Sequence, residues 1–232
     1  MVVTLHVWRV PGRHLGGALL RMARDPRRLR TLPGVRFAKM LGTGRGRTFG
    51  PGDADPTRYA ALVVWDGEPA PADVDRGWRR IAGSSARIDL EPLHSRGRWS
   101  GQEPFHPPVP KDGENGPVLA LTRARLRPVR TLTFWRCVPP VVAELDASPG
   151  LLARFGIGEA PIGWQGTVTV WRSTTDLTAF AYRQPEHRKV IARTPTDGWY
   201  AEDLFARFAV RDIHGDRAVL GWTEREGGQA TR

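Results

Sequence analysis

The stretch Val118-Leu-Ala-Leu-Thr-Arg-Ala-Arg-Leu126 repeats the pattern of Val2-Val-Thr-Leu-His-Val-Trp-Arg-Val10, 116 positions earlier in the chain. At this offset residues 3–44 align with residues 119–160 without a gap. Matched residues in the first and second half include Leu5 and Leu121, Arg9 and Arg125, Pro33-Gly34 and Pro149-Gly150, and Leu41-Gly42 and Ile157-Gly158. Two halves of the chain therefore share one structural plan.

Each half shows the same order of local patterns. Runs of branched and apolar residues bounded by turn signals predict strands, and apolar residues at helical spacing predict helices. The expected strands of the first half are Val2–Val10, Val35–Leu41, a run ending at Trp65, and Ala86–Leu93. Those of the second are Val118–Leu126, Leu151–Ile157, a run ending at Trp171, and Ala206–Ile213.

The first helix of each half is expected at His14–Leu29 and at Val129–Leu145, where Pro139 and Pro140 should kink or split it. A second helical region precedes each fourth strand. The order β-α-β-β-α-β is that of the ferredoxin-like split motif. We therefore predict an α+β fold of tandem ferredoxin-like repeats whose sheets face each other as a pseudo-dimeric α+β barrel.

The repeat also sets the expected domain limits. Residues 1–101 form the N-terminal ferredoxin-like half, and 102–117, with four prolines between 104 and 110, form a linker. Residues 118–222 form the C-terminal half, which carries the candidate site, and 223–232 form a tail.

Composition narrows the class of protein. The chain has 232 residues, is 40% hydrophobic, and has no apolar run near the roughly 20 residues of a membrane span. Its net charge of +11 comes from arginines spread along the chain, with only three lysines, which argues against nucleic-acid binding. We expect a cytoplasmic protein. Electrostatic attraction to the anionic inner face of the membrane is an additional property that the sequence leaves open.

The two halves differ around one histidine. The segment from Trp171 to Ala206 is 14 residues longer than its counterpart from Trp65 to Ala86, and His187 lies inside it. Val190 and Ile191 share the helical face of His187, so His187 is a candidate ligand for a buried cofactor. The alternatives are a hydrogen-bonded core histidine at this position, or cofactor binding through Cys137.

A glycine-rich loop, Thr43 to Arg58, marks the first half. Its backbone and arginines could contact phosphates or propionates. It lacks a Walker lysine, so we favour a plain surface loop.

Several blocks, in one order along nearly the whole chain, resemble the spheroidene monooxygenase family of carotenoid oxygenases. They are Leu32–Gly44, Gly97–Phe105, Leu121–Ala124, Gly156–Pro161, His187 and Gly198–Phe208. The chain departs from that family in its more basic loop, and in Ala153-Arg154-Phe155 where an aromatic–lysine pair is expected.

The resemblance implies a cofactor and a reaction. The cofactor is haem b, with iron held by His187, and the reaction inserts oxygen at an activated methylene of an acyclic carotenoid. The implied fold is the dimeric α+β barrel shared with haem-degrading monooxygenases, chlorite dismutases and aldoxime dehydratases. The implied partners are a hydrophobic small molecule and an electron donor such as a ferredoxin, with a homodimer left open.

Further site residues follow from placing that cofactor in the second half. Arg123 and Gln165 are the candidate catalytic residues, with a solvent-facing arginine as the alternative for Arg123. Phe180, Val190, Ile191, Trp199 and Phe205 are candidates to line the cofactor, with ordinary core packing as the alternative for the aromatic residues.

We therefore predict a haem-dependent monooxygenase of a hydrophobic, carotenoid-like substrate. Two alternatives remain open. One is a haem enzyme of other chemistry, aldoxime-dehydratase-like or oxidising a small molecule. The other is a non-catalytic haem-binding or lipid-binding protein.

Overall fold

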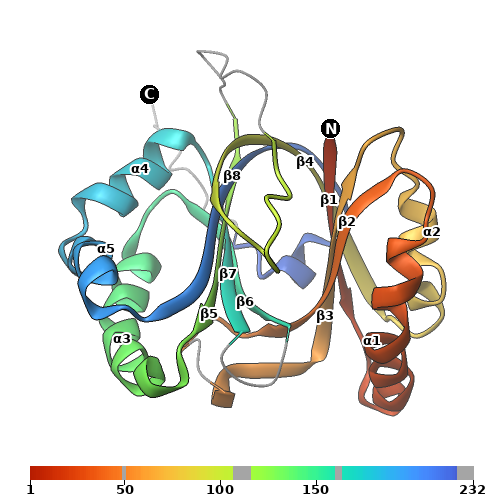
Figure 1. The fold of residues 1–232 in the computed structure, drawn as a ribbon. Coiled ribbons are helices and arrows are strands. Elements are labelled where there is room, and N and C mark those ends of the chain that lie inside the picture. Colours follow the sequence, from red (N-terminus) through yellow and green to blue (C-terminus); the bar gives the residue numbers. More distant parts are fainter. Residues whose placement is uncertain (49–50, 107–115, 160–163, 224–232) are drawn as a thin grey trace, which may run out of the picture.

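The fold is a closed barrel of eight antiparallel strands with helices packed outside it (Figure 1). The computed structural model describes residues 1–48, 51–106, 116–159 and 164–223. Most of the expected linker and tail therefore lie outside the described residues. Helices α1 and α2 cover one side of the barrel, and α3, α4 and α5 cover the opposite side.

Each half contributes four strands. Those of the N-terminal half are β1 (Val2–Arg9), β2 (Val35–Gly44), β3 (Ala54–Trp65) and β4 (Ser84–Gly97). Those of the C-terminal half are β5 (Val118–Leu126), β6 (Leu151–Gly158), β7 (Trp164–Trp171) and β8 (Tyr200–Gly215). The helices are α1 (Leu15–Arg30), α2 (Pro71–Asp75), α3 (Thr131–Ala147), α4 (Thr174–Arg183) and α5 (Pro185–Asp197).

The halves join at two seams of very different length. Strand order around the barrel is β1-β3-β2-β6-β7-β5-β8-β4. At the long seam, β4 pairs with β8 from Ala86–Gly215 to Gly97–Leu204. At the short seam, β2 pairs with β6 through Gly42–Gly158, Thr43–Ile157 and Gly44–Gly156. The sheets therefore meet edge to edge as one barrel instead of stacking as two separate layers.

Alternate residues of each strand fill the barrel interior. Val3, Leu5 and Val7 of β1 point inward, as do Leu119 and Leu121 of β5, and all are buried. The segment after β4 closes one end, because Trp99 and Phe105 are buried in the same cluster. The interior is a packed core, so a ligand site has to be sought on the outer faces, beneath the helices.

The expected α+β class and element order are confirmed, with three corrections. Helix α3 runs through Pro139 and Pro140 without being split. Both prolines are exposed, so the carbonyl groups that lose an N–H donor can bind water instead. The fourth strands extend well beyond their expected limits, and the glycine-rich loop is shorter than expected, because β2 runs to Gly44 and β3 begins at Ala54.

The extra residues of the second half form α5. Pro185 begins this helix, and Gly198, with φ of 57°, ends it in the left-handed conformation that glycine adopts without strain. The first half has the single turn Trp78–Arg80 before β4 instead. Within the described ranges no helix is long and apolar enough to cross a membrane.

Candidate functional site

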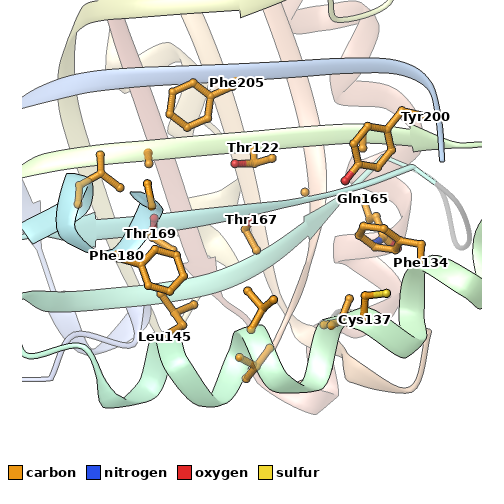
Figure 2. Close-up of a pocket in the computed structure, with 18 residues that line it drawn as sticks. Thr122, Phe134, Cys137, Leu145, Gln165, Thr167, Thr169, Phe180, Tyr200 and Phe205 are labelled. Atoms are coloured by element: carbon orange, nitrogen blue, oxygen red, sulfur yellow. The ribbon is translucent and has the colours of Figure 1, made fainter. Parts of the chain in front are cut away.

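An apolar cavity lies on the outer face of the C-terminal half, between the sheet and its helices (Figure 2). Its volume is about 200 Å³. Strands β7, β5 and β8 form the floor, and helices α3 and α4 form the walls.

The floor of the cavity consists of small side chains. Because side chains alternate along a strand, Ala120, Thr122 and Ala124 of β5 point away from the barrel core and into the cavity. Thr167 and Thr169 of β7 lie beside them. Small residues here leave room above the sheet for an apolar molecule.

The walls are mostly aliphatic and aromatic. Helix α3 contributes Phe134, Val138, Val142 and Leu145, the last of them 4% exposed. Phe180 of α4 is buried and packs against Trp171, with ring centroids 5.2 Å apart. Tyr200 and Phe205 of β8 line the remaining edge.

Two polar groups in this lining have defined partners. Gln165 Oε1 accepts a hydrogen bond from Trp135 Nε1 of α3, at 3.2 Å. The bond occupies the amide oxygen, so Gln165 can donate to a bound molecule through its NH2 group. Cys137 Sγ lies 3.6 Å from Arg193 Nη1 of α5 and 3.4 Å from the Thr133 carbonyl oxygen. An apolar cavity with a few polar groups is typical of a small-molecule site.

Helix α5 packs against α3 and α4, beside this cavity. His187 belongs to its first turn, as the sequence predicted, so the expected helix is confirmed. The side chains of His187, Val190 and Ile191 lie outside those that the structure describes. Their roles stay predictions.

The structure brings three of the expected site residues together. Gln165, Phe180 and Phe205 all line the cavity. Trp199 lies one side chain behind it, fully buried, in edge-to-face contact with Phe134 at a centroid distance of 5.8 Å. The Trp199 indole Nε1 has no hydrogen-bond partner among the described residues.

Arg123 lies on the opposite face of β5, inside the barrel end. It is 2% exposed, so the solvent-facing alternative is wrong. Its guanidinium pairs with Glu159 at 3.0 Å and with Glu202. In the strand register Ala124, and not Arg123, is the residue opposite Gln165. Arg123 therefore does not reach the cavity.

The ion pairs of Arg123 belong to a network that fastens residues 98–105 across the barrel end. Trp99 Nε1 donates to Glu159 at 2.6 Å, and the amides of Ser100 and Gly101 donate to Glu202 at 3.0 and 2.7 Å. Burial raises the pKa of Glu202, but these amides and Arg123 outweigh burial and hold it below the usual value. The network therefore has a structural role, because it holds residues 98–105 over the end of the barrel.

Sequence reasoning missed several cavity residues, notably Phe134, Tyr200 and the small side chains of the floor. Cys137 was considered as a cofactor ligand, and the structure places it in the lining. The missed signal lies in the repeat, because Trp8 of the first half corresponds to Ala124 of the second. Where a large side chain of one half corresponds to a small side chain of the other, the space is filled in the first half and open in the second.

No family model matches the chain. Individual relatives do. It is 32% identical over 222 residues to the spheroidene monooxygenase of Rhodobacter capsulatus, covering 92% of each protein. It is 34% identical over 190 residues to the spheroidene monooxygenase of Rubrivivax gelatinosus, covering 79% of this chain and 72% of that protein.

Among solved structures, an aldoxime dehydratase superposes with a TM-score of 0.57 at 13% identity, covering 91% of this chain and 81% of that one. A second aldoxime dehydratase, in complex with butyraldoxime, gives 0.55 at 11% identity, covering 91% and 79%. These likenesses concern the fold. The sequence identity and coverage of the first relatives show that the chain belongs to the spheroidene monooxygenase family.

Proposed function

We propose that this protein is a haem-dependent monooxygenase that acts on a hydrophobic, carotenoid-like substrate, with the haem in the apolar cavity and His187 as its iron ligand. One observation carries the proposal. In a chain of this family, the C-terminal half is hollow where the N-terminal half is filled, and the helix that it adds carries His187.

The cavity suits a macrocycle in chemistry more than in size. Its floor is made of small side chains and its walls are apolar, as a porphyrin face requires. Ligand pockets usually measure about 300–1,000 Å³, so a cavity of about 200 Å³ requires its walls to move outward on binding. Helices α3 and α4 form that wall, with α5 packed against both, and α3 and α4 rest on the sheet by apolar contacts that can be remade.

A haem, when bound, would supply the oxygen activation that monooxygenation needs. The NH2 group of Gln165 can donate a hydrogen bond to a molecule bound above the floor. The hydrogen bond from Trp135 holds the Gln165 amide in one orientation. Phe180 and Phe205 exclude water from the two sides. Trp199 lies behind Phe134, and its indole N–H has no partner among the described residues. This N–H is a buried donor for a hydrogen-bond acceptor on α5 or on a bound molecule.

One histidine suffices for such a cofactor. In the described part of the chain no three His, Cys, Asp or Glu residues gather as a metal site. Arg123 faces the other side of β5, so we assign it a structural role in holding Glu202 of β8.

Inserting one atom of O2 into a substrate and reducing the other to water requires two electrons, so an external donor such as a ferredoxin is needed. A long polyene is insoluble in water, so the substrate is expected to reach the enzyme from a membrane surface.

The strand order β4-β1-β3-β2 in the first half, repeated as β8-β5-β7-β6 in the second, supports a reading of the barrel as tandem ferredoxin-like units.

Purified protein reconstituted with haem tests the cofactor. We expect a Soret band, and we expect His187→Ala to lose the haem or change the spectrum while the far-ultraviolet circular dichroism is retained. Arg188→Ala, the neighbouring and exposed position on α5, is the matched control and should behave as wild type. An unchanged spectrum in His187→Ala would show that another residue holds the iron.

Cys137 gives an independent test of the location. Its thiol lines the cavity and is the single cysteine of the chain. Alkylation of Cys137 should slow at least tenfold when haem is bound. Equal rates with and without haem would place the cofactor elsewhere, whatever its spectrum. Oxygen consumption with an acyclic carotenoid then separates an enzyme from a haem-binding protein.

A further inference from the structure

A second cavity, of about 490 Å³, opens at the short seam between the halves and is strongly basic. We call it the arginine cleft, because its lining includes Arg9, Arg45, Arg47, Arg58 and Arg154. They come from four separate segments of the chain: the end of β1, the loop after β2, β3, and β6. The fold therefore gathers them from positions that the sequence keeps far apart.

The carboxylates of the cleft do not balance these charges. Asp55 is shared by two arginines, with Arg9 Nη1 at 2.9 Å and Arg58 Nε at 3.9 Å. Asp146, at the end of α3, pairs with Arg154 Nη2 at 2.5 Å. Asp53 lies behind the loop and accepts the Arg47 backbone N–H at 2.9 Å.

The remaining donors of the cleft are placed to bind an anion. Arg154 Nη1 is buried and has no hydrogen-bond partner in the described part of the chain. Arg45 and Arg47 are exposed, and neither side chain has a carboxylate partner within the described ranges. Gly46 between them has φ of 77°, a left-handed turn that sets both arginines on one short loop.

Arg58 forms a rigid back wall. Its side chain is 5% exposed, and its nitrogens bind Thr43 Oγ1 at 3.1 Å and the Gly44 carbonyl at 2.6 Å. Burial lowers the pKa of Arg58 below its usual value, and Asp55 compensates in part. Gly221 borders the same space, and a side chain there would approach Arg58 Nη1.

We propose that the arginine cleft binds a phosphate group. Guanidinium groups present paired N–H donors that match two phosphate oxygens, and a cluster of them favours a multiply charged oxyanion. The part of the glycine-rich loop that remains between β2 and β3 supplies two of the five, Arg45 and Arg47. The cleft is separate from the apolar cavity, so this site stands or falls independently of the proposed haem.

The phosphate could belong to a membrane lipid or to a soluble compound, and the experiment separates the two. Arg45→Gln/Arg47→Gln removes the two loop arginines without breaking an ion pair of the described fold. The matched control is Arg24→Gln/Arg27→Gln on α1, which removes two exposed arginines and the same charge. Each protein is co-sedimented with vesicles of 30 mol% phosphatidylglycerol in phosphatidylcholine, and titrated calorimetrically with inorganic pyrophosphate.

We expect the loop variant to lose about 25-fold in affinity for the phosphate source that binds, since each basic residue near an anionic surface contributes roughly fivefold. The α1 variant should bind as wild type does. Pyrophosphate that binds and displaces protein from vesicles identifies a lipid headgroup as the occupant, whereas pyrophosphate binding without vesicle binding identifies a soluble phosphate. Equal loss in both variants, or no binding of either probe to wild type, would overturn the proposal.

Discussion

The outer faces of the two halves have the same backbone but opposite packing. In the N-terminal half, Trp8 of β1 is paired with Tyr59 of β3, and both are buried beneath the helices. At the corresponding register of the C-terminal half, Ala124 of β5 is paired with Gln165 of β7. One face is solid and the other holds a cavity.

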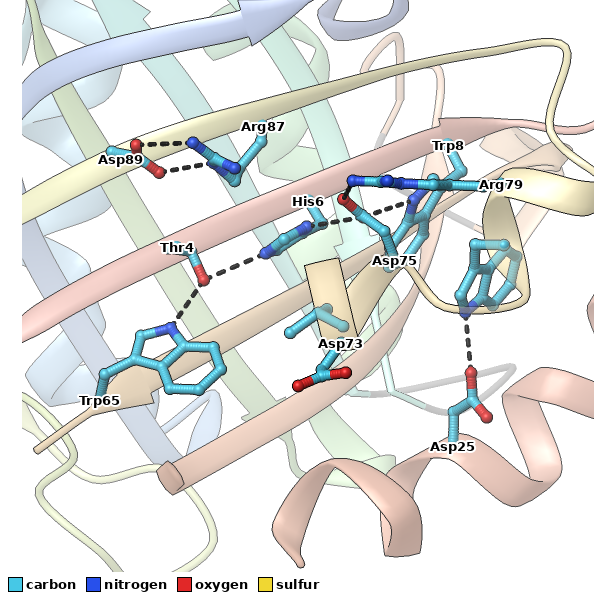
Figure 3. A network of polar contacts seen from close by, with 12 residues as sticks. Thr4, His6, Trp8, Asp25, Trp65, Asp73, Asp75, Arg79, Arg87 and Asp89 are labelled. Atoms are coloured by element: carbon cyan, nitrogen blue, oxygen red, sulfur yellow. Dashed lines mark hydrogen bonds and ion pairs between the residues drawn. The ribbon is translucent and has the colours of Figure 1, made fainter. Parts of the chain in front are cut away.

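A third aromatic ring completes the solid face. A network of hydrogen bonds and ion pairs links polar groups on the same face (Figure 3). Trp78 stacks on Trp8 with ring centroids 4.6 Å apart, and its Nε1 donates to Asp25 at 2.9 Å. His6 is fully buried, with Nδ1 2.9 Å from Asp75 and Nε2 3.1 Å from Thr4 Oγ1.

The difference shows that the site is made by removing bulk from a repeated surface. His6 and Trp8 correspond to Thr122 and Ala124, so two large rings are replaced by small side chains. This exchange of side chains leaves the barrel unchanged, because the strands and their register are the same in both halves. Side-chain volume on one sheet face therefore decides whether this half holds a cavity.

The largest expected effect comes from refilling the hollow face. Ala124→Trp restores the residue found at Trp8, so the fold should persist while the cavity disappears. We expect the affinity for haem and for an apolar fluorescent dye to fall at least 100-fold, as measured by titration. Ala201→Trp, at an exposed position of β8, is the control. A refilled protein that still binds both ligands would show that the cavity is not the site.

Emptying the solid face should cost stability instead of function. Trp78→Ala removes a fully buried ring and leaves Asp25 without its indole donor. Large core truncations of this kind cost about 3–5 kcal/mol. Phe134→Ala, at the partly exposed edge of the existing cavity, should cost only about 1–2 kcal/mol. Urea unfolding measures both, and equal costs would contradict the contrast in packing between the two faces.

The smallest effect concerns the carboxylate of the solid face. Burial raises the pKa of Asp75, but hydrogen bonds from His6 and Trp8 outweigh it and hold the pKa below the usual value. Because the folded pKa is lower than the unfolded one, of about 3.9, ionised Asp75 stabilises the fold above that pH. This stabilisation is lost as pH falls through the folded pKa.

Asp75→Asn should therefore lower the free energy of unfolding by about 1–3 kcal/mol at pH 7. The deficit should shrink as pH falls below about 4, where Asp75 of the unfolded chain takes up its proton first, and it should vanish below the lower pKa of the folded carboxyl. Asp66→Asn, an exposed carboxylate paired with Arg36 at 3.5 Å, is the control and should show little effect at any pH. A deficit that stays constant from pH 7 to pH 3 would exclude the charge as its cause.

The repeat was sufficient to predict the element order, because turn residues and strand patterns recur at one offset. It also placed His187 on an added helix. In the structure Leu119, Leu121 and Arg123 share one face of β5, as the alternation of side chains along a strand requires. Alternation could not say which face meets the helices, because apolar residues occur on both faces of β5. Arg123 was therefore assigned to the site although it lies inside the barrel.

Long-range partners were equally inaccessible to local patterns. Arg123 meets Glu159 and Glu202, and Arg58 meets the Val219 carbonyl, across separations that no periodicity reports. The arginine cleft likewise depends on the closure of β2 against β6. The basic loop and Arg154 were both visible in the sequence as departures from the family, but their proximity was not.

The unequal seams also divide the molecule into regions of different local stability. The β4–β8 ladder couples the halves into one cooperative unit, whereas the β2–β6 ladder is short and includes Gly42, Gly44, Gly156 and Gly158, which add no side-chain packing. Sub-global opening should therefore begin at the short ladder while the long one stays intact. An anion in the arginine cleft would bridge the loop after β2 to Arg154 of β6 and so oppose that opening, which would couple occupancy of the cleft to the integrity of the ring.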